Sequence, residues 1–268
     1  MTMLTPDDLA LWHRQGFLRL ERFADPAVGR AMLDEVVELV DQAAAGVDVA
    51  PAVVMPEQQP DLSPDDPGAS PHRFASKVFR IARRETFRRF VERDDLTSIA
   101  RDLIGSDDLD CFLSQFIFKN PRAWGQPWHQ DSYYFPFEPP RPIVGLWLAV
   151  TRATLENGCL HVLPGSHHEP IHHHEPDRRP GANYGYTEVV DHDTRSSVPV
   201  TMEPGDLLVF DSHLMHRSTD NASDELRAAM VFHLAASGTI DHTVREKGYS
   251  INDWLPVRPR LPARAESV

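Results

Sequence analysis

Residues 205–235 read GDLLVFDSHLMHRSTDNASDELRAAMVFHLA, and this stretch is the strongest indication of the fold class. It contains three short apolar runs, Asp206–Phe210, Met215–Ser218 and Leu226–Ala235, which are separated by turn-forming residues. Runs of the same kind precede it at Cys111–Lys119, Trp128–Phe135, Ile143–Val150, Cys159–Val162 and Ser197–Met202. About eight short strands at such intervals are typical of a β-sandwich or a jelly-roll barrel.

The residues before these strands have a helical pattern. Thr5 is a suitable N-cap for a first helix, because its hydroxyl can accept a hydrogen bond from the first turn. Apolar residues then recur at helical spacing in residues 25–45 and 85–105. Residues 16–20 alternate between apolar and polar, which predicts a short strand between the first two helices.

A polar, proline-rich run at residues 51–71 predicts a long loop over a surface or a pocket. The whole chain, residues 1–268, is then expected to form one domain that is mainly β with flanking helices. In this division residues 1–105 are mainly helical support with a lid loop, residues 106–236 are the β core, and residues 237–268 are a C-terminal extension.

The composition of the 268 residues narrows the class of protein. With 41% hydrophobic and 25% charged residues, the chain resembles a soluble globular protein. It has no apolar run of about 20 residues and no secretory leader at its start, so we expect a cytoplasmic protein without a membrane partner. Its formal net charge of -13 argues against a nucleic-acid partner, and its two cysteines are too few for a thiolate metal site.

The motif Trp128-His-Gln-Asp131 carries the first chemical signal. On a strand, alternating side chains would place His129 and Asp131 on the same face, where an imidazole and a carboxylate could share a metal ion. On the motif alone, a surface pair or a hydrogen-bonded core histidine is the more common explanation.

A third ligand is available 85 positions after Asp131, at His216. Two histidines and one carboxylate, with the remaining coordination positions open, are typical of non-haem Fe(II) oxygenases. His213 is a rival to His216. The stretch of residues 167–175 is a second rival, because it contains two His-x-Glu pairs; its prolines predict a surface loop instead.

Arg227 opens the last strand, 11 positions beyond His216. A guanidinium on a neighbouring strand could form a bidentate pair with a dicarboxylate whose other end chelates the metal. A lone arginine is more often a solvated surface charge, but the apolar residues after Arg227 favour burial here.

Several blocks of the chain together resemble the phytanoyl-CoA dioxygenase family, and especially its subgroup of phytanoyl-CoA dioxygenase domain-containing proteins. The resemblance is detailed over residues 111–236 and looser over the N-terminal helices. The blocks are Leu113-Ser-Gln-Phe-Ile-Phe-Lys119, Trp128-His-Gln-Asp131, Gly145-Leu-Trp-Leu-Ala-Val150, Ala153-Thr-Leu-Glu-Asn-Gly-Cys-Leu160, Leu163-Pro-Gly-Ser-His167, His216-Arg-Ser218, Asn221, Arg227 and Phe232-His-Leu234.

The resemblance implies a double-stranded β-helix core, of the jelly-roll or cupin-like kind, with N-terminal α-helices. It implies Fe(II), 2-oxoglutarate and O₂ as cofactor and co-substrates. By position, the metal ligands are His129, Asp131 and His216. The residues around 2-oxoglutarate are Arg227 and Ser218 at its distal carboxylate, with Trp147, Gln115 and Lys77 along the co-substrate.

Two further points follow from the resemblance. Ser218, Asn221 and Arg227 keep the family's spacing only if His216, rather than His213, is the ligand. Related halogenases replace the carboxylate ligand by a small residue, whereas Asp131 is retained, so a hydroxylase is expected.

Three functions remain open on the sequence alone. The first is a 2-oxoglutarate-dependent dioxygenase that hydroxylates a small molecule and releases succinate and CO₂. The others are a non-catalytic cupin-like protein that binds metal or 2-oxoglutarate, and a zinc hydrolase, which would leave Arg227 and Ser218 without roles. The sequence leaves open which small molecule is the substrate, whether it is a CoA thioester, and the oligomeric state.

Overall fold

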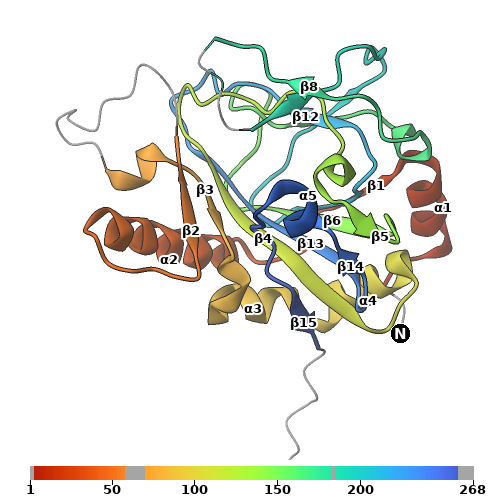
Figure 1. Ribbon diagram of the computed structural model, residues 1–268, viewed down its shortest axis with the longest axis horizontal. Coiled ribbons are helices and arrows are strands. Elements are labelled where there is room, and N and C mark those ends of the chain that lie inside the picture. Colours follow the sequence, from red (N-terminus) through yellow and green to blue (C-terminus); the bar gives the residue numbers. More distant parts are fainter. Residues whose placement is uncertain (1–2, 58–69, 181, 183–184, 259–268) are drawn as a thin grey trace, which may run out of the picture.

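Two β-sheets face each other at the centre of the molecule (Figure 1). The computed structural model describes residues 3–57, 70–180, 182 and 185–258. The larger sheet has eight strands: β1 (Phe17–Leu20), β11 (Leu207–Asp211), β6 (Ile143–Ala149), β13 (Arg227–Ala236), β4 (Leu109–Lys119), β3 (Ala75–Phe79) and β2 (Val53–Pro56) in that order, with β15 (Leu255–Val257) also on β4. The smaller sheet contains β10 (Val198–Val200), β7 (Leu160–Val162) and β12 (His216–Ser218). This arrangement is a double-stranded β-helix.

The smaller elements complete the chain. Two-stranded ribbons pair β14 (Ile240–Asp241) with β5 (Phe137–Glu138), and β8 (Glu175–Pro176) with β9 (Thr187–Glu188). The helices are α1 (Pro6–Gln15), α2 (Pro26–Ala44), α3 (Glu85–Val91), α4 (Asp94–Ile104) and α5 (Thr243–Lys247). Single 3₁₀ turns are η1 (Pro71–Phe74), η2 (Ile81–Arg83), η3 (Asp131–Tyr134) and η4 (Ser166–His168). None of the helices among the described residues is long and apolar enough to cross a membrane.

Both faces of the larger sheet are buried, and alternate side chains of its central strands face either the hydrophobic core or the cavity. On β13 the even-numbered residues from Ala228 to Leu234 pack in the main hydrophobic core. The odd-numbered residues from Arg227 to His233 point the other way, toward the smaller sheet and the cavity between the sheets. One face of each central strand therefore stabilises the fold, and the other face builds the interior of the barrel.

Helices α2, α3 and α4 cover the outer face of the larger sheet, while β8 and β12 lie on its other side (Figure 1). Helix α2 begins where Asp25 accepts a hydrogen bond from the amide of Ala27 at 2.8 Å, and Met32 and Val36 on its inner face are fully buried. Each such side chain contributes about 1.5–3 kcal/mol by leaving water. Helix α1 has the predicted N-cap, because Thr5 and Asp8 form a reciprocal capping box.

The N-terminal region contributes more than the expected helical support. Strand β1 confirms the strand predicted at residues 16–20 and pairs with β11. Strands β3 and β2 extend the sheet beyond β4. Of these two strands, β2 lies within residues 51–71, which were expected to be a long loop. The loop prediction was wrong for β2, whose residues hydrogen-bond to β3; Pro60, Pro64 and Pro67 lie outside the described residues. In the C-terminal extension β15 pairs with β4, and residues 259–268 lie outside the described part.

The strand predicted at Trp128–Phe135 is also wrong. His129 forms only a single bridge, with His216, and the 3₁₀ turn η3 starts at Asp131. The amide of Tyr133 bonds to the carbonyl of Gln130, which turns the chain out of any extended pairing. The metal-binding motif therefore lies on a tight turn rather than on a strand.

Candidate active site

The three predicted metal ligands meet at one end of the barrel. His129 and His216 are held opposite each other by two backbone hydrogen bonds, of 2.9 and 3.0 Å, between their own amides and carbonyls. Asp131 turns back toward both: its Oδ1 lies 3.4 Å from Nε2 of His129 and 3.8 Å from Nε2 of His216. One donor atom from each residue lies within 4.8 Å of the other two. Such a set can close on one divalent ion, which binds imidazole and carboxylate at about 2.0–2.2 Å.

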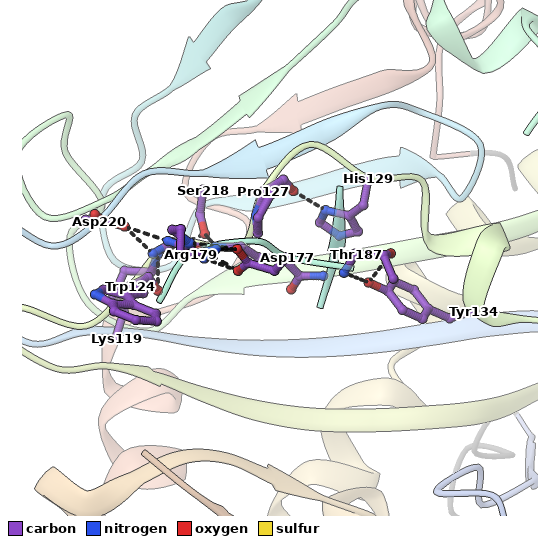
Figure 2. Close-up of polar contacts among 12 residues, drawn as sticks. Lys119, Trp124, Pro127, His129, Tyr134, Asp177, Arg179, Thr187, Ser218 and Asp220 are labelled. Atoms are coloured by element: carbon purple, nitrogen blue, oxygen red, sulfur yellow. Dashed lines mark hydrogen bonds and ion pairs between the residues drawn. The ribbon is translucent and has the colours of Figure 1, made fainter. Parts of the chain in front are cut away.

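Hydrogen bonds of the two Nδ1 atoms, which point away from the metal site, fix the orientation of both imidazole rings. Nδ1 of His129 lies 2.7 Å from the carbonyl of Pro127 (Figure 2), and Nδ1 of His216 lies 2.9 Å from the carbonyl of Leu214. A carbonyl oxygen can only accept, so each Nδ1 carries the hydrogen and each Nε2 presents its lone pair to the site. This is the tautomer that binds a metal ion.

Burial and hydrogen bonding set the charge of the ligands. Burial, together with the nearby His129, lowers the pKa of His216 to about 4, which keeps that imidazole neutral at physiological pH. Burial raises the pKa of Asp131, but the neighbouring imidazoles of His216, His129 and His233 hold that pKa well below its usual value. The site therefore offers two neutral imidazoles and one carboxylate.

A cluster of two buried cations lies in the same cavity. Arg227, which is 2% exposed, is paired in register with Lys119 on the neighbouring strand. Among the described residues, none provides a hydrogen-bond partner for Nε or Nη1 of Arg227. Burial lowers the pKa of Arg227 to about 10, and burial and Arg227 together lower the pKa of Lys119. Two adjacent buried cations, of which Arg227 has unused donors, form a site for an anion.

Ser218 is bound to this cluster through Lys119. The Nζ of Lys119 donates to the Oγ of Ser218 at 2.8 Å and to the carbonyl of Thr219 at 2.7 Å (Figure 2). The amide of Gln126 also donates to Ser218 Oγ, at 3.0 Å. Because the oxygen already accepts twice, its own hydrogen remains available for a ligand.

The remaining predicted residues line the same space. The guanidinium of Arg227 lies 5.5 Å from the ring of Trp147, and Gln115 comes from β4 on the same face as Lys119. Lys77 on β3 is buried, with its Nζ 4.7 Å from the ring of Tyr186. A cavity of about 70 Å³ is lined by all eight predicted residues: His129, Asp131, His216, Arg227, Ser218, Trp147, Gln115 and Lys77.

Two of the lining residues that were not predicted, Lys119 and His233, contact the predicted site residues directly. Lys119 ends the strand that carries Gln115, four positions later and on the same face, which is the signal that could have identified it. His233 lies six positions after Arg227, again on the same face. Its Nε2 donates to Oδ2 of Asp131 at 2.8 Å, which leaves Oδ1 facing the two histidines.

A larger cavity of about 440 Å³ adjoins this one. The two cavities share six wall residues, so the larger space reaches the metal-binding end: Lys77, Gln115, Gln126, Asp131, Tyr186 and His233. The other walls are largely apolar or aromatic: Val53, Val54, Met55, Phe79, Leu113, Tyr134, Phe135, Tyr249 and Ile251.

The rival ligands lie elsewhere. His213 bonds to Ser132 at 2.9 Å and is not one of the three clustered donors. The loop at 167–175 was expected to lie at the surface, which is wrong for its two ends: His167 and His174 are buried. The amide of Gln130 donates to Nε2 of His174 at 3.1 Å, so the loop is docked on the metal-binding turn. Neither predicted His-x-Glu pair forms a cluster, but Glu169 and His172 meet His192 from another loop.

Comparison with known proteins identifies relatives over most of the chain. A family model described as "Phytanoyl-CoA dioxygenase (PhyH)" matches residues 12–229. Phytanoyl-CoA dioxygenase domain-containing protein 1 from Bos taurus is 35% identical over 161 residues, which are 56% of this chain and 50% of that protein. Peroxisomal phytanoyl-CoA dioxygenase from Bos taurus is 40% identical over 111 residues, 41% of this chain and 33% of that protein. The matched segments thus span about half the length, or less, of these relatives.

Solved structures show the same fold. The carbocyclase SnoK, described as non-haem and α-ketoglutarate dependent, matches with a TM-score of 0.66 and 16% identity, covering 97% of this chain and 94% of its own. EctD from S. alaskensis, solved with 2-oxoglutarate and 5-hydroxyectoine, has a TM-score of 0.64 and 20% identity, covering 88% of this chain and 77% of its own. These likenesses confirm the predicted double-stranded β-helix.

Proposed function

This chain belongs to the phytanoyl-CoA dioxygenase family, and from that premise we propose that it is an Fe(II)- and 2-oxoglutarate-dependent dioxygenase. It would hydroxylate a small molecule and release succinate and CO₂. The observation that carries the proposal is the single cavity that joins a three-donor metal site to a buried guanidinium whose Nε and Nη1 have no hydrogen-bond partner among the described residues.

The residues fit both groups that the reaction requires. Two imidazoles and one carboxylate bind Fe(II) and leave coordination positions open for a chelating co-substrate and for O₂. At the other end, the planar fork of Arg227 and the free hydroxyl hydrogen of Ser218 suit a carboxylate. A dicarboxylate with a keto group at one end matches the two ends of this cavity.

The chain supplies binding, orientation and exclusion of water. Arg227 and Ser218 hold the distal carboxylate of 2-oxoglutarate, and Lys119 adds a second positive charge beside it. His233 orients Asp131 through its second oxygen. Bound Fe(II) supplies the redox chemistry that couples decarboxylation of 2-oxoglutarate to oxygen insertion into the substrate.

The larger cavity is the proposed place for the substrate. Its volume of about 440 Å³ lies in the usual range for small-molecule sites, about 300–1,000 Å³, and it reaches the face of the metal site at Asp131 and His233. Its apolar walls suit a molecule with a hydrocarbon or aromatic body.

Succinate formation tests the proposal. Purified protein with Fe(II) and 2-oxoglutarate is incubated with a panel of small molecules, and succinate is quantified with and without the metal. Asp131→Ala removes one of three ligands and should abolish Fe(II)-dependent succinate formation while the circular dichroism spectrum stays that of a β protein.

The same assay separates the alternatives. A non-catalytic metal and 2-oxoglutarate binder would bind both without forming succinate. A zinc hydrolase would act with Zn²⁺ and would not need 2-oxoglutarate. Full succinate formation by Asp131→Ala would contradict the ligand assignment.

A further inference from the structure

A second group of three metal-binding side chains lies outside the cavity. Oε2 of Glu169 is 2.7 Å from Nε2 of His172 and 2.7 Å from Nε2 of His192. One donor atom from each residue lies within 4.8 Å of the other two, as in the active site. The three side chains are 17–38% exposed, so water can reach the group. The group shares no residue with the active-site ligands.

The contacts of His192 leave it a nitrogen that can bind a cation. Its Nδ1 lies 3.1 Å from the carbonyl of Asp193, which can only accept, so Nδ1 carries the hydrogen. In the neutral ring Nε2 then has a lone pair, and this lone pair faces a carboxylate oxygen at 2.7 Å. Two acceptors this close repel each other unless a proton lies between them or both bind one metal ion.

The two loops that supply the donors are both attached to the metal-binding turn of the active site. The amide of His172 donates to the side-chain oxygen of Gln130 at 2.8 Å, and Gln130 stands between His129 and Asp131. On the other loop, the amide of Val189 donates to the carbonyl of Trp128 at 2.8 Å. A link between His172 and His192 would therefore join the two segments that support residues 128–130.

We propose that Glu169, His172 and His192 form a second, structural site for a divalent cation, with Zn²⁺ as the best match. Two imidazoles and one carboxylate suit Zn²⁺, and water completes its tetrahedron at this partly exposed position. The bound ion cross-links the loops of residues 169–174 and 189–193 and stabilises the turn that presents His129. This site is independent of the proposed function, since it uses none of the residues of the dioxygenase site.

Zinc stoichiometry on the full chain tests the proposal. Metal-free protein is titrated with Zn²⁺ alone, by calorimetry and by elemental analysis after desalting. The wild type should bind two equivalents, because Zn²⁺ also occupies the active-site ligands. Asp131→Ala should retain one equivalent, and His192→Ala in that background should retain none. His173→Ala is the matched control, since this exposed histidine lies in the same loop but outside the group, and it should keep both equivalents.

Thermal unfolding supplies a readout that does not depend on activity. In the Asp131→Ala protein, saturating Zn²⁺ should raise the unfolding temperature by several degrees, and Glu169→Gln, which preserves side-chain size, should remove the shift. X-ray absorption at the zinc edge should show two imidazoles with oxygen ligands. Retention of the last equivalent in Asp131→Ala/His192→Ala, or the absence of any bound zinc in Asp131→Ala, would overturn the proposal and leave a proton as the cation of this group. If the active site itself fails to bind metal, Asp131→Ala will match the wild type while His192→Ala still loses its equivalent.

Discussion

The surroundings of Arg227 indicate its function directly. It is a buried guanidinium with two nitrogens that have no partner among the described residues. Arg227→Ala would leave the distal carboxylate of 2-oxoglutarate buried without its main partner, which costs on the order of 2–5 kcal/mol. We expect the apparent affinity for 2-oxoglutarate to fall about 30-fold or more, measured as succinate release against co-substrate concentration.

Two controls accompany this variant. Arg227→Lys should recover only part of the affinity, because an ammonium cannot present a planar fork. Pyruvate, which lacks the distal carboxylate, should be used poorly by the wild type and should be discriminated against much less by Arg227→Ala. An unchanged 2-oxoglutarate curve in Arg227→Ala would remove this residue from the co-substrate site.

Lys119 gives a prediction about ligand-induced stability. Its ammonium lies in register with Arg227 and binds Ser218, so it neutralises part of the charge of a bound dicarboxylate. Lys119→Met should lower the affinity for 2-oxoglutarate about tenfold, because one of the two positive charges beside the distal carboxylate is lost. The measurement is the rise of the unfolding temperature with 2-oxoglutarate. Lys247→Met, in the wall of the larger cavity only, should keep the wild-type rise.

His167 makes stability depend on pH. Burial, followed by the charge of His168, lowers the pKa of His167 from 6.5 to about 4. Between these values the unfolded chain takes up a proton that the folded protein resists, so the free energy of unfolding falls as the pH falls from about 6.5 to about 4. The contribution is complete above that window. His167→Phe should make the decline shallower in urea unfolding at a series of pH values.

The control for His167 is His167→Gln, which also removes the titration and should give the same shallower slope. Parallel pH profiles for wild type and both variants would show that other groups govern acid sensitivity.

At the scale of elements, β12 has three residues, and two of them, His216 and Ser218, belong to the proposed active site. One side of it pairs with β7, and the other side contacts the backbone around Gly125. A Cβ on Gly125 would lie 1.9 Å from the carbonyl oxygen of Ser218. Gly125→Ala should therefore lower the free energy of unfolding by about 1–3 kcal/mol and weaken 2-oxoglutarate binding, because β12 must move.

Gly238→Ala is the comparison for this variant. Gly238 has open space around it but a φ of 88°, so it reports the cost of a left-handed backbone alone, about 1 kcal/mol. Urea unfolding gives both free energies. Equal losses in the two variants, with unchanged ligand binding, would contradict the role given to Gly125.

The central strands could be predicted because their own sequence determines them. β13 is apolar along its length, with Arg227 and His233 on one face, and the same apolar run predicts both the strand and the burial of Arg227. The turn at Asp131 could not be predicted this way, because the residues from Trp128 to Phe135 resemble a strand. Hydrogen bonds to His216 and Ser212, together with the local bond from Tyr133 to Gln130, bend the chain. The spacing of His129 and Asp131 predicted their convergence although the reason given, a strand, was wrong.

Residues whose roles depend on contacts with distant parts of the sequence were the hardest to predict. Lys119 acquires its role from register with Arg227, 108 positions later, and no local pattern encodes that register. Strands β2 and β3 are short runs among prolines and polar residues, and they are stable as strands because β4 offers them a paired edge. The meeting of Glu169 and His172 with His192 likewise depends on two loops that only the fold brings together.

At the scale of the whole molecule, we expect the helical region and the barrel to unfold as one cooperative unit. Residues before 106 supply β1 on one side of the larger sheet and β3 with β2 on the other. A chain that starts at residue 106 would expose both edges and the apolar face that α2 and α4 cover. We expect it to aggregate or to lack a cooperative thermal transition by circular dichroism. Co-expression with residues 1–105 should restore a folded complex, and independent folding of the shorter chain would contradict this unity.

The paired cations Arg227 and Lys119 also have a consequence for the lifetime of the protein in a cell. Proteolysis acts on the small unfolded population, and a ligand that binds only the folded state reduces that population. At a concentration 100 times its dissociation constant, 2-oxoglutarate would add about 2.7 kcal/mol and lower the unfolded fraction about 100-fold. A cell whose supply of this metabolite falls would therefore degrade the protein faster, so that the abundance of the protein follows the state of carbon metabolism without a dedicated regulator.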